Sequence, residues 1–311
     1  MTSRADLPRI VAAMKAGGYY RRVMSAGAEL DRVKAYLRAF EAADFSGALP
    51  DMDPTYPPFP GLRHEVFHDP ASLPGAAMLE RSWRAIRDEA QALDAAAELD
   101  YTIASRPVRR LLHPGTWLRR HAPPRAWTVY PLHYMGVEVE GLTRRCPRTL
   151  AIVNSLPGLC VAYPWGDAVV SVQGPGSRLP VHCSIDNLRV RCHLALRIPE
   201  GAGIRVGGQE RRWKEGRCLV FEDAFAHEVW NDSAERRVVL IVDFWHPDLT
   251  PAERQALEAG FRKAQVRRIF LGQRIGATGS AGTYVPFLEA AVEAQEADPA
   301  LRDYWEASSA S

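Results

Sequence analysis

The sequence predicts a mainly β core flanked by helices on both sides. Short β-rich segments recur through the middle of the chain, turn residues separate them, and helical periodicity appears before and after them. Closely spaced short strands of this kind are typical of a β-sandwich or a β-barrel. The expected strands cover 126–135, 158–163, 168–173, 188–198, 203–207, 217–221, 227–230 and 236–244.

The helical signals divide the chain into an N-terminal extension (1–75), a β-rich domain (76–250) and a C-terminal extension (251–311). The N-terminal extension contains an apolar stripe with helical spacing, followed by a proline-rich segment that must be a turn or an extended loop. A second stripe predicts a helix over 76–99 that would cover one sheet. The two stripes are Leu30, Val33, Leu37 and Phe40, and Leu79, Trp83, Ile86, Ala90, Leu93 and Ala97.

The C-terminal extension begins with a clear helix start. Thr250, Pro251 and Glu253 form the pattern of a capping box with proline at the first helical position. A glycine-rich loop over 272–282 precedes a last expected helix near 285–297. We expect this loop to be a connector, with a lid over the active site as the alternative. The helices of this extension could cover the barrel or form a homodimer contact.

The composition is that of an ordinary globular protein. The 311 residues are 47% hydrophobic and 24% charged, with a net charge of +2, which argues against nucleic acid or an anionic membrane as the main partner. No stretch approaches the ~18 consecutive apolar residues of a membrane span, and the N-terminus lacks the apolar core of a signal peptide. We therefore expect a cytoplasmic protein. Only four of the 39 basic residues are lysine, which indicates a GC-rich bacterial coding bias.

The cysteines indicate buried thiols. They are odd in number and lack CxxC spacing, so the sequence argues against a disulfide framework or a structural zinc site built from them. The five are Cys146, Cys160, Cys183, Cys192 and Cys218.

The expected strand 188–198 alternates between two sets of residues. Its even positions are all apolar, and alternation places the two sets on opposite sides of a sheet. The other set is therefore either a solvated cationic surface or the lining of an anion-binding cavity. The flanking sequence favours the cavity, with the last arginine left as a surface residue. The odd positions are Arg189, Arg191, His193, Ala195 and Arg197.

Two histidines and an arginine stand around this strand. His182 precedes it, His227 follows 45 residues after His182, and Arg237 lies ten residues further on. This order fits a 2-oxoglutarate oxygenase, in which two histidines hold a divalent metal at the mouth of a β-barrel. The arginine would pair with the distal carboxylate of the co-substrate. Spacing alone leaves a structural role open for either histidine.

A series of motifs surrounds these three residues in a fixed order. They are Arg191-Cys-His193-Leu-Ala-Leu, Trp213-x-x-Gly216, Phe221-Glu-Asp-Ala-Phe-x-His227-Glu-Val-Trp230, and Asp243-Phe-Trp-His-Pro-Asp-Leu, with Phe59-Pro-Gly-Leu, Trp83-Arg-Ala-Ile-Arg-Asp-Glu89 and Cys146-Pro-Arg-Thr149 upstream. In these motifs, residues 59–255 resemble the aspartyl/asparaginyl β-hydroxylase family. The resemblance implies a double-stranded β-helix core, of the jelly-roll or cupin-like kind, and Fe(II) with 2-oxoglutarate and O2.

The resemblance also implies roles for the matching positions. Two positions are implied as metal ligands, His182 and His227. Ser171 and Arg237 would contact one end of 2-oxoglutarate. His193 and Arg191 would contact the other end.

Neighbouring residues leave alternatives open. Ser184 stands two residues after the first histidine, where most oxygenases of this class have a carboxylate ligand. The β-hydroxylases lack that carboxylate and complete the site with water, and Asp186 is the competing ligand. Asp223 is expected to hydrogen-bond a metal-bound water. Arg189 either meets an acidic substrate side chain or lies at the surface.

The activity implied by the resemblance is hydroxylation of an unactivated carbon with release of succinate and CO2. The first expectation for the substrate is the β-carbon of an Asp or Asn residue in a peptide or a related amino-acid substrate. A free amino acid, a natural-product intermediate or an acyl chain is the alternative. A halogenase, for which Ser184 leaves room, and a non-catalytic barrel that senses metal or 2-oxoglutarate are further readings.

Overall fold

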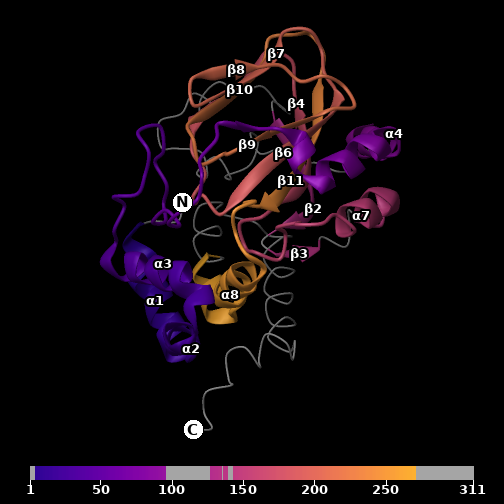
Figure 1. The fold of residues 1–311 in the computed structure, drawn as a ribbon. Coiled ribbons are helices and arrows are strands. Elements are labelled where there is room, and N and C mark those ends of the chain that lie inside the picture. Colours follow the sequence, from indigo (N-terminus) through magenta and orange to yellow (C-terminus); the bar gives the residue numbers. More distant parts are fainter. Residues whose placement is uncertain (1–3, 96–126, 135, 139–142, 271–311) are drawn as a thin grey trace.

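The computed structural model describes residues 4–95, 127–134, 136–138 and 143–270. Among these residues, two antiparallel sheets face each other and helices cover the outside (Figure 1). The helices are α1 (Leu7–Ala16), α2 (Tyr19–Ser25), α3 (Asp31–Ala42), α4 (Pro74–Ala95), α7 (Pro147–Asn154) and α8 (Pro251–Arg262). The expected loop 272–282 and the expected helix near 285–297 lie outside the described residues.

From β4 to β11 the chain crosses repeatedly between the two sheets, with β7 and β8 paired as neighbours in the smaller sheet. The larger sheet has the order β1-β9-β6-β11-β4-β2-β3, and the smaller has the order β5-β10-β7-β8. This alternation from β4 to β11 is the eight-stranded jelly roll, so the double-stranded β-helix expectation is confirmed. The strands are β1 (Phe67–His68), β2 (Trp127–Tyr134), β3 (Val137–Glu138), β4 (Ala168–Gln173), β5 (Ser177–His182), β6 (Arg189–Arg197), β7 (Ala202–Val206), β8 (Gln209–Arg211), β9 (Cys218–Phe221), β10 (His227–Asn231) and β11 (Arg237–Trp245).

One expected strand is absent. Residues 158–163 pair with the larger sheet only through an isolated bridge between Leu159 and Phe244, and turns precede and follow that bridge. Gly158 has a φ of +77°, which turns the chain before a ladder can extend. The apolar run is nevertheless buried, which is why the pattern resembled a strand. The sequence also missed β5, because Pro180 and the exposed Val181 interrupt its alternation.

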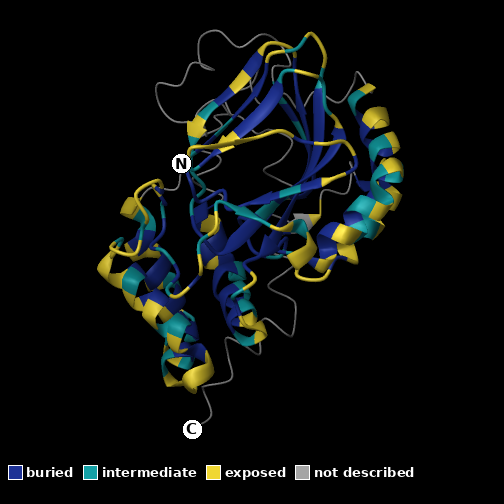
Figure 2. Ribbon diagram, turned by 45° about the horizontal axis from the view of Figure 1, so that its top comes forward, coloured by how far each residue is buried: buried dark blue, intermediate teal, exposed yellow. Residues whose placement is uncertain are grey.

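Helix α4 covers the outer face of the larger sheet. Its apolar stripe packs against the even-numbered, outward side chains of β6, such as Val190, Cys192 and Leu194. Burying each large aliphatic side chain there contributes roughly 1.5–3 kcal/mol. The prediction that this helix buttresses a sheet is confirmed, and the odd-numbered residues of β6 consequently face the space between the two sheets. Figure 2 shows the buried side of α4 turned to the strands and its exposed side turned to solvent.

The N-terminal helices and α8 form a second core at one end of the barrel (Figure 1). Aromatic residues dominate it, and Tyr163 and Trp245 join it to the barrel. The Arg32 guanidinium donates to the Glu253 carboxylate at 2.7 Å and so connects α3 to α8. The same glutamate completes the predicted capping box with Thr250, which is confirmed.

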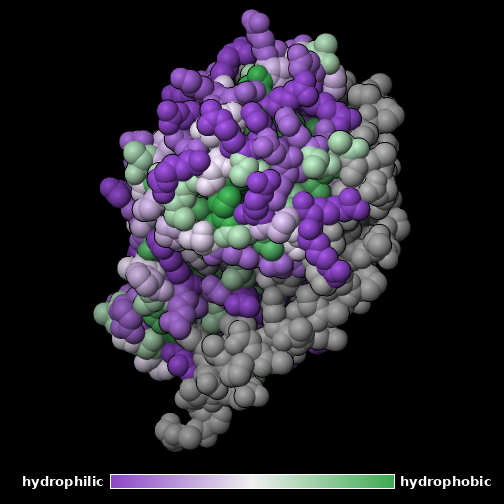
Figure 3. Space-filling model, turned by 90° about the vertical axis from the view of Figure 1, so that its right-hand side faces the viewer, coloured by the Kyte–Doolittle hydropathy of each residue, from purple (hydrophilic) through white to green (hydrophobic). Residues whose placement is uncertain are grey.

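The cysteines are thiols, as the sequence predicts. All five cysteines are free, and four of them are buried, while Cys183 is half-buried. None of the described helices is long and apolar enough to cross a membrane. Figure 3 shows polar side chains over most of the coloured surface on the side of α4 and α7, with small apolar spots between them.

Candidate active site

His182 and His227 lie directly opposite each other on the paired strands β5 and β10. Their ring centroids are 4.1 Å apart. In each ring, Nδ1 lies within hydrogen-bond distance of a backbone carbonyl two residues earlier, Pro180 O at 2.8 Å and Phe225 O at 2.9 Å. A carbonyl can only accept, so both Nδ1 atoms carry the proton and Nε2 is the basic nitrogen of each neutral ring. This is the orientation that histidine ligands of a metal adopt.

Burial keeps the second ring neutral. The pKa of His227 lies well below its ordinary value, mainly because the ring is desolvated and secondly because His182 is close. A neutral imidazole presents a lone pair instead of a proton, so this pair could hold a divalent metal ion.

Three of the four residues expected around 2-oxoglutarate meet on the inner face of the larger sheet. Arg237 on β11 donates to Ser171 Oγ on β4 and to His193 Nδ1 on β6, both at 3.4 Å. All three side chains are buried, and Trp127 Nε1 donates a second hydrogen bond to Ser171 Oγ at 3.1 Å. The register explains the meeting: Val239, two residues along β11 from Arg237 and on the same face, is opposite Ser171.

Donors without partners remain in this group. Because Arg237 donates to His193 Nδ1, the proton of that neutral ring lies on Nε2, and this buried atom has no hydrogen-bond partner among the described residues. Arg237 Nε is also buried, and no described residue accepts from it. Burial lowers the pKa of Arg237 to about 9, and no described carboxylate forms an ion pair with it. A buried cation beside unsatisfied donors fits an anion as ligand.

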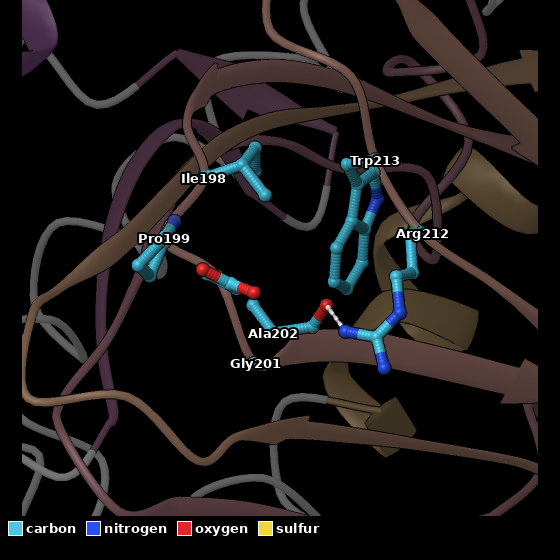
Figure 4. Close-up of a pocket in the computed structure, with 7 residues that line it drawn as sticks. Ile198, Pro199, Gly201, Ala202, Arg212 and Trp213 are labelled. Carbon is cyan, nitrogen blue, oxygen red and sulfur yellow. Dashed lines mark hydrogen bonds between the residues drawn. The ribbon is translucent and has the colours of Figure 1, made fainter.

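Trp213 closes this group on one side. Its ring lies over the Arg237 guanidinium at 4.2 Å and stacks on the His193 ring with centroids 5.9 Å apart. We expected a core aromatic here, and the residue is buried, but its contact with Arg237 was not predicted. Trp213 also lines a pocket of about 530 Å³ (Figure 4). The other lining residues are Ile198, Pro199, Glu200, Gly201, Ala202 and Arg212.

Arg191 is placed differently from the other three. It donates to both carboxylate oxygens of Asp243 at 2.8 Å, and it lies 3.2 Å from Asp223 and 3.5 Å from Asp167. Its side chain is 18% exposed, so it reaches the space between the sheets without being open to bulk water. Asp243 shares the inner face of β11 with Arg237, and strand alternation could have identified it.

Arg189 is enclosed by acceptors. It donates to Trp165 O at 3.0 Å, to Asp223 at 3.3 Å and to Ser184 Oγ. Its side chain is only 4% exposed, so the surface alternative is wrong for this residue. With these contacts in place, the guanidinium is directed at protein groups. Arg197 is the exposed case on β6, where it pairs with Glu235.

The residues near the first histidine are now located. Ser184 donates its backbone N–H to Asp223 O at 2.7 Å, so these two residues lie side by side next to the histidine pair. Asp186 accepts from the Tyr163 hydroxyl and from Leu188 N, both at 3.1 Å. These contacts direct its carboxylate to the aromatic core under α3 and do not direct it to His182.

Known proteins resemble this chain over the barrel. The sequence profile described as aspartyl/asparaginyl beta-hydroxylase matches residues 80–247, more than half of the chain. The rat protein named aspartate beta-hydroxylase domain-containing protein 2 is 38% identical over 213 residues, which are 68% of this chain and 56% of that protein. Human aspartyl/asparaginyl beta-hydroxylase is 35% identical over 183 residues, 58% of this chain and 22% of that protein. The chain therefore spans 56% of the length of the first relative and 22% of the second.

A likeness to solved structures is also found. A prolyl-4-hydroxylase from Pseudomonas putida aligns over 53% of this chain and 87% of its own, with a TM-score of 0.34 and 20% identity.

Proposed function

The chain belongs to the aspartyl/asparaginyl β-hydroxylase family, and from this premise we propose that it is an Fe(II)- and 2-oxoglutarate-dependent hydroxylase. His182 and His227 would hold the metal through Nε2. Bound Fe(II), with 2-oxoglutarate and O2, supplies an oxidant that can hydroxylate an unactivated carbon while succinate and CO2 leave. The protein residues provide binding, orientation and exclusion of water.

The observation that carries this proposal is the state of Arg237. It is a fully buried cation without a described carboxylate partner, beside a His193 N–H that lacks an acceptor. One carboxylate of the co-substrate would supply the missing charge and the missing acceptor together, through charge-assisted hydrogen bonds worth about 1.5–3 kcal/mol each. Because His193 lies 3.4 Å from Arg237, we place it at the Arg237 end of 2-oxoglutarate, and not at the other end as the resemblance implied. Ser171 would add a further contact to the same carboxylate.

Asp223 and Ser184 would act at the remaining side of the metal. Ser184 has no carboxylate, so water would complete the coordination, and Asp223 would accept a hydrogen bond from that water. Asp223 already contacts both Arg189 and Arg191, which fixes its orientation. We assign Arg189 to that positioning task instead of direct substrate binding.

The substrate assignment follows the family. The relatives are named for aspartate and asparagine β-hydroxylation, which supports the β-carbon of an Asp or Asn residue in a peptide as the site of reaction.

A mass-spectrometric assay tests the proposal. The protein is first loaded with Fe(II) and 2-oxoglutarate under anaerobic conditions. Separate samples then receive Asp- and Asn-containing peptides, free amino acids or a metabolite extract, and all are exposed to air. The expected result is a product that gains one oxygen atom, with matching succinate, and loss of both in His182→Ala. A chlorinated product, or binding of 2-oxoglutarate without turnover on any arm, would overturn the hydroxylase assignment.

A further inference from the structure

A second group of metal-ligating side chains lies apart from the His182–His227 pair. It consists of His64, His68, Glu222 and His246, and it joins the short strand β1 to the segments after β9 and β11. Residues near chain positions 65, 222 and 246 have no regular spacing that connects them, so the sequence alone does not predict that they meet. The sheet brings them together because β1 pairs with β9.

The group is buried around one carboxylate. Glu222 is fully buried, the His68 side chain is 8% exposed and His246 is 1% exposed. His68 Nε2 lies 3.1 Å and His246 Nε2 lies 3.7 Å from Glu222 Oε1. The three ligand atoms all lie within 4.8 Å of one another.

These distances are close to those between the ligands of a small divalent ion. Zn²⁺ takes nitrogen and oxygen ligands at about 2.0–2.2 Å, so two ligands of a tetrahedral ion are roughly 3.3–3.6 Å apart. The separations of 3.1 Å and 3.7 Å lie just below and just above that range, so binding an ion requires only a small shift of each ring.

One atom of the group has an unmet requirement. His246 Nε2 is buried and has no hydrogen-bond partner, because 3.7 Å from Glu222 is too long for a hydrogen bond. The other nitrogen of this ring accepts the Asp248 N–H at 3.2 Å, which leaves the proton on the unpartnered Nε2. A buried polar group in this state costs free energy. If the proton moves to Nδ1, at the cost of the Asp248 contact, the lone pair of Nε2 becomes available to a cation beside the carboxylate.

We propose that His68, Glu222 and His246 form a second metal site, for a divalent ion of the Zn²⁺ class. The bound ion takes Nε2 of both rings and Oε1 of the glutamate. Each ring then carries its proton on Nδ1, and the Asp248 contact opens. These are three protein ligands, and water would take the fourth position of a tetrahedral ion. We assign the site a structural role, because its ligands attach the segment 59–68 to the barrel.

The groups next to these ligands support the assignment. His64 Nδ1 contacts Glu222 Oε2 at 2.7 Å, and the Glu65 N–H donates to Oε1 at 2.7 Å. Such contacts orient a ligating carboxylate and raise the affinity of the metal. The residue after Glu222 is Asp223, which contacts Arg189 and Arg191, so the second site also steadies the backbone beside the candidate active site.

Metal analysis of the purified full chain separates the two sites. The variants are incubated with Zn²⁺ alone, desalted and measured for bound zinc per chain. The expected result is two equivalents in the wild type and one in the His182→Ala/His227→Ala double variant. His68→Gln keeps a side-chain donor towards Glu222, so it should fold, and it should lose only the second equivalent. His133→Asn is the matched control, because His133 contacts Asn154 and lies outside both groups.

Affinity and spectra complete the test. His64→Ala should weaken Zn²⁺ at this site by about 10–100-fold, the usual effect of removing a group that orients a ligand. Cobalt bound to the His182→Ala/His227→Ala variant should give the intense visible absorption of a tetrahedral ion, and Glu222→Gln should abolish it. The proposal is overturned if the His182→Ala/His227→Ala variant binds no metal. It is also overturned if both His68→Gln and Glu222→Gln still bind two zinc ions per chain. A single equivalent lost in His68→Gln but kept in the double variant would support this site and contradict the iron assignment instead.

Discussion

Arg237 and Arg189 lie on the inner face of the same sheet and are both buried, but their surroundings differ. Arg237 contacts a hydroxyl, an imidazole and an indole ring, and no described carboxylate pairs with it. Arg189 lies within 4 Å of the carboxylates of Asp186, Asp223 and Asp243. The same residue type therefore has two different roles. An arginine that is paired with carboxylates of the protein stabilises the fold, whereas an arginine without such a partner is available to an anionic ligand.

Replacing Arg189 should produce the largest effect, on stability. Arg189→Met leaves three buried carboxylates short of a cation, and removing one partner of a buried ion pair costs about 3–5 kcal/mol. Urea unfolding at neutral pH measures this loss. Arg197→Met, at an exposed position of the same strand, should change the free energy of unfolding by no more than about 0.5 kcal/mol. A similar small change for Arg189 would show that its carboxylates do not depend on it.

Replacing Arg237 should act on the ligand instead. Arg237→Met removes charge-assisted hydrogen bonds of about 1.5–3 kcal/mol each, so the affinity for 2-oxoglutarate should fall about 100-fold or more. The unfolding free energy of the ligand-free protein should stay the same or rise, because an unpaired buried cation is lost. Calorimetric titration of 2-oxoglutarate into metal-loaded protein checks the first part. Arg237→Lys should recover only part of the affinity, because lysine cannot make the two-pronged contact. If the affinity of Arg237→Met for 2-oxoglutarate is unchanged, Arg237 does not bind the co-substrate, and the contrast with Arg189 is wrong.

The pH dependence of stability tests Asp167, one of the carboxylates around Arg191. Burial is the main cause that raises its pKa to about 7, and Arg191 opposes the shift. The folded chain therefore binds a proton that the unfolded chain releases between about pH 4 and pH 7, so this group lowers stability as pH rises through that window. Asp167→Asn should be more stable than the wild type by about 1–2 kcal/mol at pH 8, a figure reduced because the side chain is 21% exposed.

The pH series supplies its own control. The advantage of Asp167→Asn should shrink towards zero as pH falls below about 4, because Asp167 is then increasingly protonated in both the folded and the unfolded wild type. Thermal unfolding at four pH values measures it. A difference that is constant with pH would show that the asparagine acts through packing.

Trp213 should give the smallest effect. A desolvated cation–π contact contributes up to about 2 kcal/mol, so Trp213→Leu should lower the affinity for 2-oxoglutarate by about tenfold. The affinity for the metal should not change. Trp230→Leu is the matched control, because Trp230 contacts the partly exposed Arg178 and Arg205 on the smaller sheet. Equal losses in both variants would mean that general destabilisation, and not the Arg237 contact, is responsible.

The sequence predicted much of this barrel because strand alternation is local. The expected strand 168–173 matches β4, and the alternation in 188–198 correctly separated the face under α4 from the inner face. The capping box at Thr250 was equally readable, since all its atoms lie within one helical turn. The segment 158–163 failed because an apolar run shows burial and not pairing.

What the sequence by itself determined is which residue types stand on which face of each strand, together with the order of the motifs. Only the tertiary structure decided which charges are paired. Arg191 and Arg237 are equivalent in strand pattern, yet Asp243 meets the first and no described carboxylate meets the second. The tertiary structure also brings His68, Glu222 and His246 together from three distant segments of the chain. Partners across a sheet depend on register and on burial, and neither is written in local spacing.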